Sequence, residues 1–160
     1  PFLTSSVSRI GRRAAMKRCF LNMLALSAGF TFIYVLVQLV GVSVFVDMDI
    51  LISKHFYQNM IFYYIAVFII FSFGGVCYLL FYVITRLKIV SLLMAVAVNL
   101  YMVNYLKIDN LYFGLTVIDT MSLGGSVQAV IWFLKRVRDI AITTGIYMLA
   151  DVVYEKRDIV

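Results

Sequence analysis

The chain has 160 residues, of which 64% are hydrophobic and 14% are charged, and its net charge is +6. Soluble globular domains carry about 25% charged residues, so this composition argues against a soluble globular protein. The positive charge does not indicate nucleic-acid binding, because no region outside the apolar stretches is large enough to present a basic groove.

Residues 1–18 form a basic amino-terminal segment. At 100° per residue its basic side chains share one helical face, opposite an apolar face. We expect a basic amphipathic helix that lies on an anionic membrane surface. The same Arg- and Ser-rich, acid-free composition is typical of a mitochondrial targeting segment or its retained end. The alternative is an ordinary basic flank of the first membrane span.

Four stretches that follow are almost free of charge and long enough to cross a bilayer: 19–46, 56–85, 89–106 and 111–134. About 20 apolar residues in a helix cover the hydrocarbon core of roughly 30 Å. Their continuous apolar character, without alternation, favours helices over a barrel. Loops of 9, 3 and 4 residues join them. The sequence therefore predicts an all-α membrane protein with four transmembrane helices in an up-and-down bundle.

Two glycine pairs are the expected bends or points of close helix approach, because Pro1 is the only proline. Gly74-Gly75 lies in the second stretch, and Gly124-Gly125 lies in the fourth.

Asp119 is the one acidic or basic residue inside a predicted span. A charge at that depth costs at least a few kcal/mol, so we expect it to be protonated, hydrogen-bonded or exposed to water. It either relays protons or binds a cation, or it makes a buried interhelical hydrogen bond. A span that starts near Thr120 would instead place it at the interface. The predicted intramembrane polar and packing residues are Asp119, Ser122, Ser126, Asn99, Asn104, Gly124 and Gly125.

Residues 135–160 form a carboxy-terminal segment that begins with basic residues. The uncharged run from Ile140 to Ala150 is too short for an ordinary span. We expect a short interfacial helix there. A strongly tilted fifth span is the alternative.

The basic residues predict the orientation of the chain. Both termini and the second loop hold 12 of the 14 Lys and Arg residues. The positive-inside rule therefore places both termini in the cytosol, or in the matrix of a mitochondrion. We expect the bound lipid to be an anionic phospholipid, with cardiolipin as a candidate. The residues expected to contact it are Arg9, Arg12, Arg13, Lys17, Arg18, Lys135, Arg136 and Arg138.

Motifs for catalysis or cofactor binding are missing from the sequence. His55 is the only histidine, and neither Cys19 nor Cys77 lies in a CxxC spacing. No P-loop, GxSxG or HExxH pattern occurs. We therefore expect that the chain is not an enzyme, and that it holds no metal ion and no cofactor besides bound phospholipid.

Function is inferred by elimination. The favoured expectation is a non-catalytic accessory subunit of a larger integral membrane complex, with a respiratory or ATP synthase assembly of the mitochondrial inner membrane preferred. Its partners would be membrane lipid and other transmembrane subunits, and not nucleic acid. One alternative is a small homo-oligomeric channel or carrier that uses Asp119. The other is an endoplasmic-reticulum or plasma-membrane protein that handles lipids or assists another protein.

Overall fold

The structure is a computed structural model that describes residues 11–53, 55–105 and 117–156. Side chains are described within these ranges except at 12, 13, 102–105 and 117–129. In this part of the chain every regular element is a helix. The helices are α2 (Arg12–Phe45), α3 (Met48–Ser53), α4 (Phe56–Thr85), α5 (Lys88–Tyr105) and α6 (Val117–Lys156).

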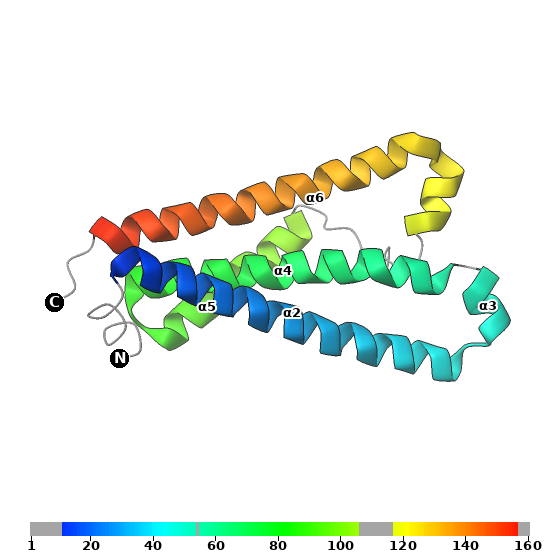
Figure 1. Ribbon diagram of the computed structural model, residues 1–160, viewed down its shortest axis with the longest axis horizontal. Helices are drawn as coiled ribbons and strands as arrows, with labels where there is room; N and C mark the ends of the chain where they lie inside the picture. Colours follow the sequence, from blue (N-terminus) through cyan, green and yellow to red (C-terminus); the bar gives the residue numbers. More distant parts are fainter. Residues whose placement is uncertain (1–10, 54, 106–116, 157–160) are drawn as a thin grey trace.

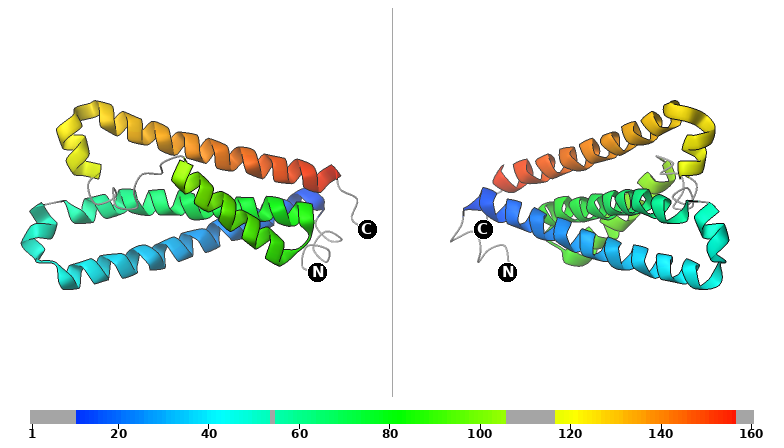
Figure 2. Two further views of the ribbon diagram at one scale, coloured as in Figure 1. Left: turned by 180° about the vertical axis from the view of Figure 1, so that it is seen from behind. Right: turned by 45° about the vertical axis from the view of Figure 1, so that its right-hand side comes forward.

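Helix α4 is the centre of the bundle. It packs against α2, α5 and α6, and against the short α3. Helices α2 and α6 meet at the end of the bundle opposite α3 and diverge toward α3 (Figures 1 and 2). The beginning of α2 and the end of α6 lie at the same end, next to the turn between α4 and α5 (Figure 1). The four longer helices therefore run alternately up and down.

Three clusters of buried apolar side chains hold these helices together. Each cluster contains residues of α4, which explains why α4 is the most enclosed helix. The α3-end cluster comprises Val35, Leu51, Phe56, Met60, Tyr63 and Val67. The cluster at the opposite end comprises Met16, Leu79, Val83, Ala150 and Tyr154, and the α4–α5 cluster comprises Phe73, Cys77 and Ala95.

A tight turn sets α5 antiparallel to α4. Arg86 ends α4 in the left-handed conformation, with φ 58°, and its N–H donates to Tyr82 O. Thr85 Oγ1 lies 2.9 Å from Ser91 Oγ on α5 and accepts a hydrogen bond from the N–H of Leu87 at 3.3 Å. These side-chain hydrogen bonds satisfy polar groups that the helix ends leave free.

The predicted all-helical fold is confirmed for the described residues. The predicted second stretch, 56–85, coincides with α4, and the third, 89–106, nearly coincides with α5. Helix α2 begins before the predicted first span, at Arg12.

The expectation for the carboxy-terminal part is wrong. Helix α6 runs without interruption from Val117 to Lys156, so no separate interfacial helix begins after Leu134. Lys and Arg are good helix formers, and no Gly, Asn or Pro stands between 134 and 140 to end the helix. The first part of α6, which contains Gly124 and Gly125, bends sharply against the rest (Figure 1).

Two helices in the described part are long and apolar enough to cross a membrane, over Ala14–Phe45 and Phe56–Thr85. Lys88–Tyr101 of α5 is apolar but shorter. By length and composition these helices suggest a membrane protein only weakly, because the core helix of a soluble protein passes the same test. Four membrane spans are therefore not confirmed by this criterion.

Candidate functional site

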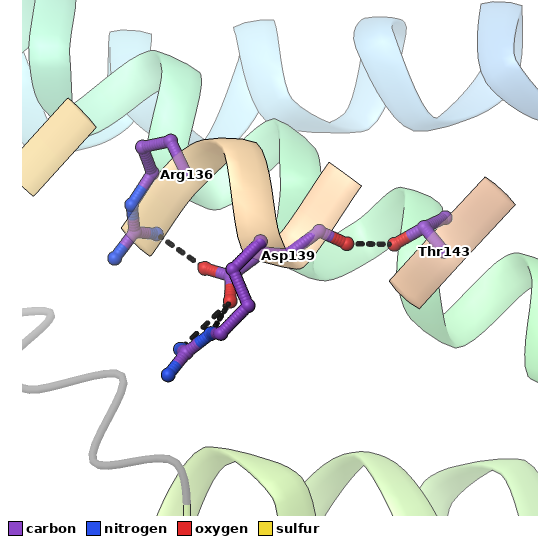
Figure 3. A network of polar contacts seen from close by, with 4 residues as sticks. Arg136, Asp139 and Thr143 are labelled. Atoms are coloured by element: carbon purple, nitrogen blue, oxygen red, sulfur yellow. Dashed lines mark hydrogen bonds and ion pairs between the residues drawn. The ribbon is translucent and has the colours of Figure 1, made fainter. Parts of the chain in front are cut away.

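The candidate site is a charge cluster on α6, made of the buried Arg136 and Asp139 and the exposed Arg138. Arg136 is 8% exposed and Asp139 is 6% exposed. The Nη1 atom of Arg136 lies 3.5 Å from Asp139 Oδ2, and Nη2 of Arg138 lies 2.8 Å from Asp139 Oδ1. One carboxylate therefore serves two guanidinium groups, as Figure 3 shows for Arg136.

Local helix geometry places these groups together. Arg136 and Asp139 are three residues apart, which brings their side chains to one face of the helix. Thr143 lies one turn further and donates from Oγ1 to Asp139 O at 2.8 Å (Figure 3). The backbone around the carboxylate is therefore held by its own helix.

Aromatic side chains attach this cluster to α4. The guanidinium carbon of Arg136 lies 5.6 Å from the ring centre of Trp132. Trp132 in turn contacts Phe62 of α4 edge to face, with ring centres 5.2 Å apart. A guanidinium over an indole ring is attracted by the electrons of the ring, more strongly where water is excluded. This contact positions Arg136 between α6 and α4.

The cluster lies opposite the middle part of α4. Trp132 contacts α4 at Phe62, and Ile142 packs against the apolar α4–α5 cluster, which contains Phe73. The charges on residues 136–139 therefore lie at a level between Phe62 and Phe73. At 1.5 Å per residue, that level lies about 10 to 25 Å from the beginning of α4, which is about 45 Å long.

The charges of the cluster do not balance. Two guanidinium groups and one carboxylate leave one positive charge in excess. In addition, Nε and Nη1 of Arg136 and Oδ2 of Asp139 have no hydrogen-bond partner among the described residues. Buried polar atoms are nearly always hydrogen-bonded in native proteins. Arg136 is enclosed, whereas the side chain of Arg138 is 41% exposed, so the excess positive charge is accessible to an anionic group at Arg138.

Most residues of the predicted polar site lie where their side chains are not described. Asp119, Ser122, Gly124, Gly125 and Ser126 belong to the backbone of α6, and Asn104 belongs to that of α5, but their side chains fall outside the described part. Asn99 is described, and its amide packs against α4 at Gly74. A Cβ atom at Gly74 would lie only 2.8 Å from Asn99 Nδ2. Gly74 is thus a point of close helix approach, as the sequence predicts.

The basic residues predicted to contact lipid have different surroundings. Lys17 and Arg18 are exposed at the beginning of α2, and Lys135 and Arg138 are exposed on α6. Arg136 is instead buried beside Asp139. Arg9 lies outside the described residues, and the side chains of Arg12 and Arg13 are likewise outside them.

Sequence reasoning missed Asp139. The fourth span was predicted to end at Leu134, so the charges after it were assigned to a membrane flank. The pairing signal is nevertheless present in the sequence, because Arg136 and Asp139 are spaced for an ion pair on a helix and an apolar run follows from Ile140.

No group of three or more His, Cys, Asp or Glu side chains suited to a metal ion occurs among the described residues. Comparison with known proteins finds no match: no family model, no curated protein and no solved structure is similar to this chain.

Proposed function

We propose that this chain is a multi-pass membrane protein that acts as a non-catalytic subunit of a larger membrane complex, packing against other transmembrane helices. One observation carries the proposal: apolar side chains face outward while small polar ones are buried. On α2, Leu26 and Phe30 are both 64% exposed, whereas Ser27 is 7% exposed and Thr31 is fully buried. Thr31 satisfies its hydroxyl by donating to Ser27 O at 2.7 Å.

The exposure of α2 argues against the core helix of a soluble protein. Of the most apolar 18-residue stretch of α2, only 17% is buried. Soluble monomers rarely expose apolar patches larger than a few hundred Å². Lipid tails or apolar partner helices would cover such a surface, since hydrocarbon does not penalise exposed Leu and Phe.

The packing of α6 along α4 supports a fourth membrane-embedded helix. If α4 crosses the bilayer, the α6 residues opposite its middle part lie within the hydrocarbon core as well. Arg136 and Asp139 would then be enclosed by protein, which is how charged residues persist at that depth, whereas the exposed Arg138 would need a partner or the interface. In this arrangement α2, α4, α5 and α6 cross the membrane, and both termini lie on one side.

The excess positive charge supports a partner within the membrane. A carboxylate from a neighbouring transmembrane helix would pair with the exposed guanidinium of Arg138 and neutralise the excess charge. The outward faces of α2 and α5 offer further apolar surface for such neighbours: Leu21, Phe32, Leu93 and Leu100 are each at least 59% exposed. We place the complex in the mitochondrial inner membrane, because the acid-free basic segment before the first span is typical of imported proteins.

The first test is extraction of native membranes with a gentle detergent, followed by native gel separation and mass spectrometry of the comigrating proteins. Migration with respiratory or ATP synthase subunits would support the proposal in full. If the protein resists alkaline extraction but migrates alone, it is a membrane protein and the subunit role is refuted. Recovery in the soluble fraction without detergent would refute both.

Topology provides a second test, using single-cysteine variants in a background where Cys19 and Cys77 are serine. Ser53 of α3 and Lys156 at the end of α6 are both exposed. With four crossings, Ser53→Cys and Lys156→Cys react with an impermeant maleimide from opposite sides of sealed vesicles. Labelling of both from one side would contradict the arrangement.

A second candidate function is a small channel or carrier, and the charge cluster is the observation that favours it. Ionisable residues within membrane helices often mark ion or proton pathways. In that case the purified protein in proteoliposomes conducts ions, Asp139→Asn abolishes the flux, and Asp49→Asn at an exposed position of α3 leaves it unchanged. Equal fluxes in vesicles with and without the protein would eliminate this candidate.

A further inference from the structure

A groove of about 710 Å³ runs along the surface between α2 and α4. Its α2 wall includes Asn22, Leu26 and Phe30, and its α4 wall includes Phe71, Gly75 and Tyr78. Its lining extends on α2 from Cys19 to Val37, about 27 Å of helix. Apart from Asn22 and Ser27 and the tips of the tyrosines, these walls are apolar.

The size of the groove excludes a transmembrane helix as its occupant. A helix of 10 to 12 Å diameter would fill about 2,100 Å³ or more over the same length. A methylene group takes nearly the space of a liquid water molecule, about 30 Å³. A chain of about 16 to 18 carbons therefore needs about 500 Å³, which this groove can accommodate.

Gly75 gives the groove its depth on the α4 side. A Cβ atom there would lie 2.6 Å from Met23 Sδ and 2.8 Å from Met23 Cγ. The glycine thus lets Met23 sink against the α4 backbone. A larger residue at 75 would push Met23 outward, toward the space where a bound chain would lie.

At one end of the groove, Arg18 directly precedes Cys19, the first α2 residue of the groove lining, and is not itself part of that lining. Arg18 precedes Asn22 by four residues, so both lie on the same face of α2, and both are exposed. This is the end of the bundle at which both α2 begins and α6 ends (Figure 1). Under the proposed topology it is the side of the membrane where the basic residues gather, at the level of the phosphate groups.

We propose that the α2–α4 groove binds one acyl chain of an anionic phospholipid, whose phosphate contacts Arg18 and Asn22. This inference rests on the proposed membrane location but not on the subunit role. The apolar walls select a hydrocarbon chain, and the terminal guanidinium selects a negatively charged headgroup. A basic side chain that contacts the headgroup directly contributes about a fivefold preference for anionic lipid.

The test is native mass spectrometry of the protein purified in detergent, with phosphatidylglycerol or phosphatidylcholine of identical chains added. Leu26→Trp fills the groove, and Leu21→Trp is its matched control, because Leu26 is 64% exposed and Leu21 is 63% exposed on another face of α2. Arg18→Glu removes the headgroup contact. Lys88→Glu, at the exposed start of α5, makes the same charge change elsewhere.

The expected result is a preference of about fivefold or more for phosphatidylglycerol. Arg18→Glu removes this preference, Leu26→Trp weakens the binding of both lipids, and neither control changes binding. Inorganic phosphate does not displace the lipid, because the acyl chain supplies part of the affinity. Equal binding of the two lipids by the parent protein, or equal effects of the two tryptophan variants, would overturn the inference. A protein that stays soluble without detergent would instead refute the membrane location itself.

Discussion

Among the glycines whose surroundings the structure describes, Gly74 and Gly75 make the closest contacts with neighbouring helices, and they give a stability prediction. A Cβ atom at Gly74 would lie 2.8 Å from Asn99 Nδ2 on α5, and one at Gly75 would lie 2.6 Å from Met23 Sδ on α2. The double variant Gly74→Ala/Gly75→Ala therefore forces neighbours on both sides of α4 to move. The matched control is Gly29→Ala/Gly41→Ala on α2, where a Cβ atom meets nothing within 4 Å.

The expected difference in stability between the two double variants follows from two opposing effects. Alanine within a helix is more favourable than glycine by about 0.5–1 kcal/mol per site, and both double variants gain this equally. Forcing a side chain into packed space costs about 1–3 kcal/mol per site, and only the α4 variant pays it. We therefore expect the α4 double variant to be less stable than the control double variant by about 2–6 kcal/mol.

Reversible unfolding in mixed micelles with increasing SDS, followed by circular dichroism at 222 nm, measures this difference. The control should unfold at a higher SDS fraction than the parent, and the α4 variant at a lower fraction than the control. Equal stabilisation of the two double variants would show that α4 does not approach α2 and α5 at the glycine pair.

Two further predictions use the same unfolding assay. Asp139→Leu leaves two guanidinium groups without their carboxylate and should lower the free energy of unfolding by about 3–5 kcal/mol. Arg136→Met leaves the carboxylate paired with Arg138 and should lower it clearly less. Equal losses in the two variants would contradict a carboxylate shared by both guanidinium groups. Thr85→Val removes the contact with Ser91 and the N–H bond that close the α4–α5 turn, and should cost about 1–2 kcal/mol. Thr144→Val is the control, because it loses only a hydrogen bond to a carbonyl of its own helix, and it should change stability by about 0.5 kcal/mol or less. An equal loss in both threonine variants would refute a stabilising role of Thr85 in the α4–α5 turn.

The candidate site could be predicted from the sequence only in part. The close approach at Gly74 follows from the rule that small residues let helices meet, and the structure shows it against Asn99. The spacing of Arg136 and Asp139 follows the rule for ion pairs on a helix, but a hydropathy reading takes the run of charges after Leu134 as the end of a span. Whether a charged side chain faces water or protein depends on what packs over it, and no local pattern contains that information.

The sequence by itself determined the helical class and the limits of α4, because continuous apolar runs and main-chain hydrogen bonding are local properties of the chain. It also contained the glycine pairs, since the absence of a side chain is a property of one residue. Only the tertiary structure decided that Trp132 and Phe62 bring the charges of α6 against α4, and that a groove remains open between α2 and α4. These features arise from contacts between residues distant in sequence, whose free energy depends on how the helices pack together.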